Sequence, residues 1–218
     1  PWHSRRLDGV RDRLAYRTRQ RGLVRRSLAA MATMTPGLST GEDVVHGMRL
    51  WYSTARISYA RRAPAYVLHD EGGDRISAAP RPAAESLRFL DAALDADVVD
   101  RLDAAQRLAF AVKVLRTHVM DILAASLRNG LPDADRAALV VAVDRIVELA
   151  PTSRHVLSRR DDLLLRMLAS GASASAIAAE HSRRQQWTSP ATVLPARMSR
   201  VLHREAPLRF LVAALLSR

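Results

Sequence analysis

The fold of this chain is decided around residues 37–77, whose composition differs from the helix-forming sequence that follows. The segment opens with Gly37-Leu38-Ser39-Thr40-Gly41-Glu42-Asp43-Val44-Val45-His46-Gly47-Met48-Arg49-Leu50-Trp51. It continues through Ala55-Arg56-Ile57-Ser58-Tyr59 to Tyr66-Val67-Leu68-His69-Asp70-Glu71-Gly72-Gly73-Asp74-Arg75-Ile76-Ser77. The order of features is an acidic helix start, two short β-type runs and a polar loop.

The first feature is a helix that begins at an acidic pair. Ser39 and Glu42 have the spacing of a capping box, and apolar residues then recur at helical spacing from 44 to 51. Glu42 and Asp43 therefore fall in the first turn, where free N–H groups and the helix dipole favour ionised carboxylates. Both acids can simply cap the helix, or one can cap while the other points into a cleft.

Two short β-type runs follow this helix. Residues 56–60 alternate in polarity, Pro64 ends that run, and residues 65–69 form the second one. Gly72-Gly73 then breaks the chain into a loop. His69 is therefore expected at the end of a strand, where it is a ligand-binding residue, a structural residue or a solvent-facing one.

Taken in order, these features resemble the acceptor-side half of a family-2 glycosyltransferase catalytic domain of GT-A type. The resemblance covers roughly residues 20–80. It implies that Asp43 is the base in inverting sugar transfer and that Glu42 is its acceptor-side neighbour. It also implies that His69 helps to bind a divalent metal, Mg or Mn, with the diphosphate of the donor. Arg75 and Ser77 are the further candidates for binding that diphosphate.

The resemblance implies a nucleotide-sugar donor, a hydroxyl or polyol acceptor, and a role in cell-envelope or exopolysaccharide synthesis. A family member also has an N-terminal donor half with an Asp-x-Asp metal motif. The Asp-x-Asp strings at 95–97 and 133–135 precede helical sequence and are interpreted as helix starts. We therefore expect the C-terminal fragment of a longer enzyme, inactive by itself.

The expected fold class is α+β and mostly α. Residues 1–79 form a partial GT-A-like catalytic remnant with short strands, and residues 80–218 form an all-helical C-terminal domain. A proline-containing linker at 78–82 marks the boundary.

Composition limits the classes of function. The 218 residues are 48% hydrophobic and contain no cysteine, which excludes disulfides and thiolate metal sites. This composition fits a cytoplasmic protein, including one at the inner face of the membrane. The net charge of +12 comes almost entirely from arginine, because Lys113 is the only lysine. Such a charge attracts nucleic acid, an anionic membrane surface or anionic substrates without choosing among them.

The C-terminal sequence predicts a set of helices. The strongest covers 98–129, where an apolar seam repeats at heptad spacing and suits either bundle packing or self-association into a homo-oligomer. The seam consists of Leu108, Val112, Leu115, Val119 and Ile122. Further helices are expected at 133–150, 160–169, 173–186, 197–204 and 207–217. Near the N-terminus we expect a basic helix at 8–20, a strand at 22–26 and a helix at 26–34.

The alternative function is a non-enzymatic, basic helical binding module. Residues 160–204 resemble a helix-turn-helix segment, which would bind DNA. Pro190 and Pro195 interrupt the part that would be the recognition helix, which argues against nucleic acid as the partner. A scaffold that oligomerises through helix 98–129 is a third possibility.

Overall fold

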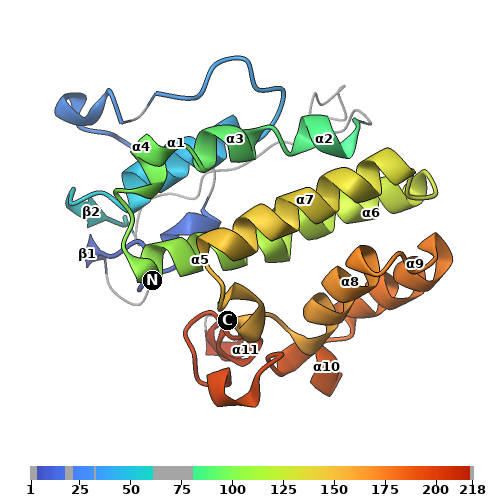
Figure 1. Ribbon diagram of the computed structural model, residues 1–218. Helices are drawn as coiled ribbons and strands as arrows, with labels where there is room; N and C mark the ends of the chain where they lie inside the picture. Colours follow the sequence, from blue (N-terminus) through green and yellow to red (C-terminus); the bar gives the residue numbers. More distant parts are fainter. Residues whose placement is uncertain (1–3, 18–21, 32, 61–80, 217–218) are drawn as a thin grey trace, which may run out of the picture.

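The structure is a computed structural model that describes residues 4–17, 22–31, 33–60 and 81–216. These residues form a mostly helical molecule with one two-stranded sheet, as the mostly-α prediction requires (Figure 1). The strands are β1 (Arg5–Leu7) and β2 (Ile57–Ser58). The helices are α1 (Glu42–Trp51), α2 (Ala83–Ser86), α3 (Phe89–Ala93), α4 (Ala96–Val99), α5 (Ala104–Val114), α6 (Met120–Arg128), α7 (Asp133–Leu149), α8 (Arg159–Ala169), α9 (Ala174–Ser182), α10 (Pro190–Val193) and α11 (Pro207–Leu216).

The central element is one continuous helical run from α5 through a π-helical turn (Leu115–Val119) into α6. Its start is fixed by a capping box, in which the N–H of Gln106 donates to Asp103 over 2.8 Å and the N–H of Asp103 donates to Gln106 over 3.1 Å. Its end is followed by Gly130 in the left-handed conformation, with φ of 76°. The predicted helix at 98–129 is thus confirmed over most of its length. It begins later than expected because Asp103 caps it.

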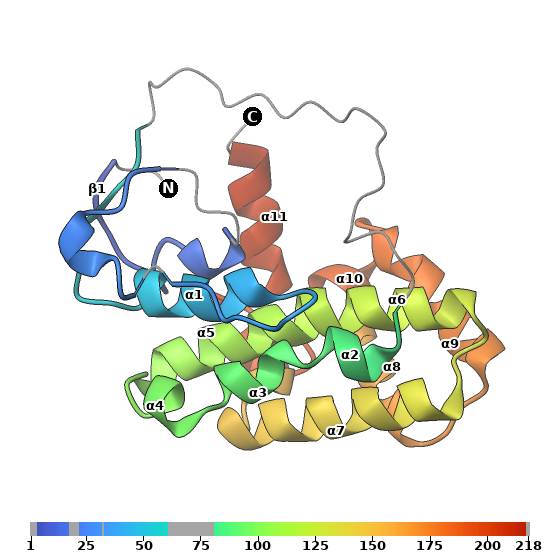
Figure 2. The same ribbon diagram turned by 90° about the horizontal axis from the view of Figure 1, so that it is seen from above.

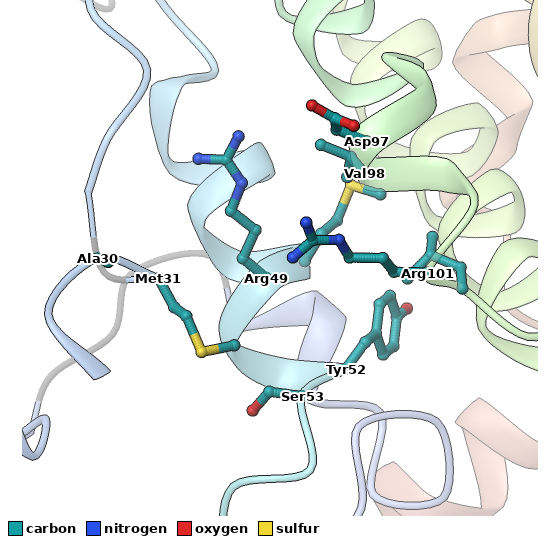
Figure 3. A pocket seen from close by; sticks show the side chains of 10 residues that line it. Ala30, Met31, Arg49, Tyr52, Ser53, Asp97, Val98 and Arg101 are labelled. Carbon is teal, nitrogen blue, oxygen red and sulfur yellow. The ribbon is translucent and has the colours of Figure 1, made fainter. Parts of the chain in front are cut away.

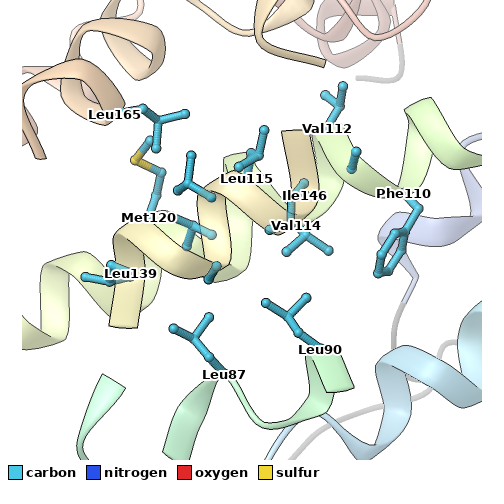
Figure 4. Close-up of a cluster of buried hydrophobic side chains, with 14 of the residues drawn as sticks. Leu87, Leu90, Phe110, Val112, Val114, Leu115, Met120, Leu139, Ile146 and Leu165 are labelled. Carbon is cyan, nitrogen blue, oxygen red and sulfur yellow. The ribbon is translucent and has the colours of Figure 1, made fainter. Parts of the chain in front are cut away.

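The predicted seam of this helix is bundle core. Val112, Leu115 and Val119 are fully buried, and Leu108 and Ile122 are partly buried against the same cluster. Figure 4 shows how side chains from the turn after α2 and from α3, α7 and α8 converge on the central run. Because the middle of the seam is covered by the chain's own helices, self-association would have to use other residues.

A buried carboxylate ties three helices together beside this core. Asp135, in the first turn of α7, accepts a hydrogen bond from the backbone N–H of Ala83 (2.9 Å) and another from the hydroxyl of Ser126 (2.7 Å). Asp135 therefore acts as an acidic residue in the first turn of a helix that accepts hydrogen bonds from buried donors. α7 begins at Asp133, as predicted. The string at 95–97 likewise marks the start of α4.

The N-terminal predictions are wrong in their secondary structure. Residues 8–17 form turns and a short 3-10 helix (Leu14–Tyr16) in place of a long basic helix. The carboxylates of Asp8 and Asp12 accept backbone N–H bonds locally, at 2.6 Å from Arg11 and 2.9 Å from Asp8, and so compete with helix formation. β1 pairs antiparallel with β2, which lies about fifty residues later.

Two further N-terminal expectations also differ from the structure. Residues 22–25 are irregular, and the expected helix at 26–34 is reduced to a 3-10 turn (Arg26–Leu28). The second β-type run, at 65–69, lies outside the described residues.

The C-terminal helices α8 and α11 match their predictions, whereas the helix expected at 197–204 is reduced to a 3-10 turn (Met198–Arg200). The backbone before this turn bonds elsewhere: the N–H of Ala196 donates to Leu157 (2.8 Å) and that of Arg197 donates to His155 (3.1 Å). α9 is also shorter than expected and ends at Ser182.

The last helix packs against the N-terminal segment, which only the tertiary structure brings to it (Figure 2). The rings of Tyr16 and Phe210 meet edge to face, with centroids 5.1 Å apart. The hydroxyl of Tyr16 donates to the buried carboxylate of Glu205 (3.1 Å) and accepts from Arg116 (3.0 Å). Among the described helices, none is long and apolar enough to cross a bilayer.

A matched pair on α7 tests the assignment of the core. Ile146 is fully buried and Val141 is 57% exposed. We expect Ile146→Ala to lower the free energy of unfolding by about 2–5 kcal/mol, since it leaves a cavity, and Val141→Ala to change it by less than about 0.5 kcal/mol. Denaturant unfolding of both variants measures the difference. Equal losses would show that α7 does not bury the face described here.

Candidate functional site at the start of helix α1

The acidic pair predicted from the sequence occupies the first turn of α1, and both carboxylates are half-buried. The capping box is wrong, because Gly41 rather than Ser39 is the N-cap and no side chain caps the helix. Gly41 has φ of 80°, and its carbonyl accepts the N–H of Val44 (3.0 Å). The left-handed turn at Gly41 starts the helix two residues later than the sequence spacing suggested.

Gly41 also packs closely against α3. A Cβ atom at this position would lie 2.7 Å from Cβ of Phe89, so only glycine fits without movement. The ring of Phe89 in turn packs at a tilt of 52° against His118, with centroids 5.0 Å apart. Phe89 of α3 therefore lies between the start of α1 and the π-helical turn of the central run.

Lys113 lies in α5 near this junction and is almost completely buried, with 4% of its surface exposed. Its ammonium group makes no hydrogen bond or close ion pair in the described part of the chain. Burial lowers the pKa of Lys113 to about 8, and the negative charge of Asp43 opposes that shift. Asp43 is thus the carboxylate that compensates this buried cation.

His118 completes the group as a neutral ring. Burial lowers its pKa to about 3, and the positive charge of Lys113 lowers it further. Its Nε2 atom is buried and has no hydrogen-bond partner among the residues described. Around the start of α1 the structure thus collects a carboxylate, a buried ammonium and an uncharged imidazole.

This arrangement leaves the carboxylate of Asp43 able to accept a hydrogen bond from a ligand. No described residue donates a hydrogen bond to it, and it lies two residues after Gly41, whose backbone is close to Phe89. A half-buried carboxylate with a fixed position and a free acceptor atom can bind or deprotonate a hydroxyl group brought against it.

The remaining predicted site residues, His69, Arg75 and Ser77, lie outside the described residues. Over residues 4–17, 22–31, 33–60 and 81–216, no three potential metal ligands come together. The structure therefore brings none of these three residues to Asp43, and their predicted roles stay predictions.

Two hollows lie along α1, further from its start. The first, of about 360 Å³, lies between α1 and α4 and is shown in Figure 3. The second, of about 570 Å³, is lined by the end of α1, by β2 and by residues 22–28. Trp51 lines the second hollow, and its indole N–H donates to the backbone carbonyl of Arg17 over 3.0 Å.

Sequence reasoning missed Lys113 and His118 as parts of this site. The signal for Lys113 was present, since the only lysine of an arginine-rich chain stands inside the apolar run 108–115. A lysine in such a position is expected to be buried with a compensating charge. The identity of that charge, Asp43, depends on how α1 packs against α5 and is not encoded locally.

Comparisons of the chain with protein-family models, curated proteins and solved structures found no significant match.

The fit of Gly41 against Phe89 is tested by comparing two glycines that both have positive φ. A Cβ at Gly130 (φ of 76°) would meet nothing within 4 Å, so Gly130→Ala adds backbone strain alone. We expect Gly41→Ala to destabilise the protein by about 1–3 kcal/mol more than Gly130→Ala, because it also displaces Phe89. Thermal or denaturant unfolding gives both values. Similar losses of stability in the two variants would show that the contact between Gly41 and Phe89 does not limit the residue at position 41.

The burial of Lys113 predicts a pH dependence of stability. Its folded pKa of about 8 lies below the ordinary value of 10.5, so the unfolded state binds more protons between these values. The free energy of unfolding should therefore rise as pH increases through this window, by an amount on the order of 3 kcal/mol at most.

Lys113→Met is the variant that isolates this effect, since it keeps a side chain of similar length without the charge. We expect it to be more stable than the wild type near pH 7 and to lose the added slope between about pH 8 and 10.5. Denaturant unfolding at several pH values measures both slopes. Parallel slopes in the two proteins would contradict the buried state of Lys113.

Proposed function

We propose that this chain forms the acceptor-side part of an inverting glycosyltransferase, which transfers a sugar from a nucleotide-diphospho-sugar to a hydroxyl or polyol acceptor. The observation that carries the proposal is the state of Asp43. Its carboxylate is half-buried in the first turn of α1, receives no hydrogen bond from the described residues, and raises the pKa of the buried Lys113 through its negative charge. A base that must accept a proton from an acceptor hydroxyl needs such a free acceptor atom in a fixed position.

In this proposal Asp43 accepts the hydroxyl proton as the acceptor oxygen attacks the anomeric carbon and the bond to the diphosphate breaks. A carboxylate at a helix start is a weak base. Most of the acceleration must therefore come from positioning and from stabilising the departing diphosphate. The contact between Gly41 and Phe89 supports the positioning part, because it fixes where α1 begins. Glu42, the preceding residue, is proposed as the acceptor-side neighbour of the base.

His69, Arg75 and Ser77 are the candidates for stabilising the departing diphosphate, and His69 has this role because of the family resemblance. The described residues supply no cluster that fits a divalent metal. The proposal therefore contains no step through a metal, and Mg or Mn stays an expectation from the family resemblance.

The proposed GT-A-like remnant at residues 1–79 is joined to the helical part by a shared core. Val44, Val45 and Met48 of α1 belong to the same buried cluster as α2, α3, α5 and α7. In the proposal, the helical part at residues 80–218 positions α1, the helix that carries the base, by packing against it.

The DNA-binding alternative has weaker support from the geometry. α8 and α9 pack as a helix pair, but α10 has four residues, whereas a recognition helix must extend along the major groove. The arginines near this segment also have internal partners: Arg160 contacts Glu180 at 3.1 Å, and Arg184 contacts Asp161 at 2.7 Å. We therefore place the enzyme first.

The proposed base is tested by Asp43→Asn in the protein as the native cell produces it. Asparagine keeps the shape and loses the proton acceptor, so we expect sugar transfer to fall by at least about 100-fold while donor binding is retained. Transfer is measured with radiolabelled nucleotide-sugar, and donor binding by calorimetry.

The matched control is Asp133→Asn. Asp133 also lies in the first turn of a helix but is exposed, and its charge does not act on Lys113. This variant should transfer at the wild-type rate. Turnover retained in Asp43→Asn would remove Asp43 from the role of base, and equal losses in both variants would show a general effect of removing helix-start charges.

A further inference from the structure

We infer that the hollow between α1 and α4 is a binding site for a small organic phosphate. The inference does not rest on the proposed glycosyltransferase activity. It depends on two arginines, on the apolar surface between them and on the size of the hollow, which are properties of the described residues alone.

The two arginines come from different elements and extend into the same space. Arg49 projects from the exposed side of α1, and Arg101 projects from the turn that follows α4 (Figure 3). In contrast to Arg116, Arg160 and Arg184, which have hydrogen-bond and ionic partners, neither has a partner for its guanidinium group in the described structure. Among the described residues, two cations without an ion-pair partner thus line one hollow.

The space beneath the arginines is apolar. Met48, Val98 and Leu102 line it and are themselves at least nine-tenths buried, and the ring of Tyr52 forms part of the wall. The volume of about 360 Å³ lies at the lower end of the range for small-molecule sites. An occupant therefore needs a compact apolar or ring-shaped part in addition to its charged group.

The charged group that suits two guanidinium groups is a phosphate. Each guanidinium presents a planar fork of N–H donors that can pair with two phosphate oxygens at once. A single phosphate has enough oxygens to be shared between both side chains. Asp97 also lines the hollow and carries the opposite charge, so it should weaken the binding of an anion.

This hollow and the acidic start of α1 lie on the same helix but are separate sites. Arg49 follows Glu42 by seven residues, which places it two turns further along the same face, about 10 Å away along the axis. If the enzyme proposal also holds, the phosphate would belong to the acceptor molecule.

The test uses the 218-residue chain and titrates it with phenyl phosphate by calorimetry. Inorganic phosphate and phenol are the two partial probes. We expect phenyl phosphate to bind more tightly than either, because only it fills both the arginine edge and the apolar floor. Backbone amide shifts in a nitrogen-15 NMR titration should be largest near Ser53 and Leu102, which line the hollow.

Three charge variants make the test specific. Arg49→Gln and Arg101→Gln should each weaken phenyl phosphate binding by about tenfold or more, since each loses a charge-assisted, two-point contact. Arg159→Gln removes an exposed arginine from α8 and should leave affinity within about twofold. Asp97→Asn should tighten binding, because it removes the opposing charge.

Several results would overturn the inference. These are an absence of binding by the wild type, an equal loss of affinity in Arg159→Gln, or amide shifts confined to other parts of the chain. Inorganic phosphate is titrated separately. If it binds more tightly than phenyl phosphate, the two arginines bind a simple anion, and the inference of an organic phosphate is wrong. Loss of glycosyl transfer is not a readout here, so failure of the enzyme proposal leaves this test unaffected.

Discussion

Burial of the helical run from Ala104 to Arg128 is the constraint on which the rest of the structure depends. Its side chains are covered on one side by α2 and α3 and on others by α7 and α8, and Phe110, Leu115 and Met120 have no exposed surface. Apolar burial of this extent is the main favourable contribution to folding in a chain without disulfides. α2, α7 and α9 pack directly against this run.

The same constraint creates the unusual electrostatics at the start of α1. Lys113 lies on a turn of the central run where the neighbouring residues are all buried, so its charge is removed from water unless a carboxylate is near. α1 supplies Asp43, and the positive φ of Gly41 lets the helix begin close to Phe89. The carboxylate of Asp43 therefore lies next to an apolar core. Packing of this core against α1 limits the positions that the carboxylate can take.

α1 then serves two separate regions of the surface. Its acidic start carries the proposed base, while Arg49, two turns away, faces a hollow shared with Arg101. The two regions have opposite charge and lie about 10 Å apart along the helix. A single ligand with a hydroxyl at one end and a phosphate at the other would be oriented by this difference, whereas a neutral ligand would not.

The sequence by itself determined the elements whose signals are local. The periodicity of α1 and α7, the seam of the central run, the acidic helix starts and the helix end at Gly130 depend on residues within a few positions of one another. The site was predicted in part: Asp43 and Glu42 lie at a helix start, as expected. Only the tertiary structure decided that the charge of Asp43 acts on Lys113, that Arg49 and Arg101 share a hollow, and that residues 8–17 turn instead of forming a helix. Each of these depends on burial and on contacts between residues far apart in the chain, and no local pattern of residues contains that information.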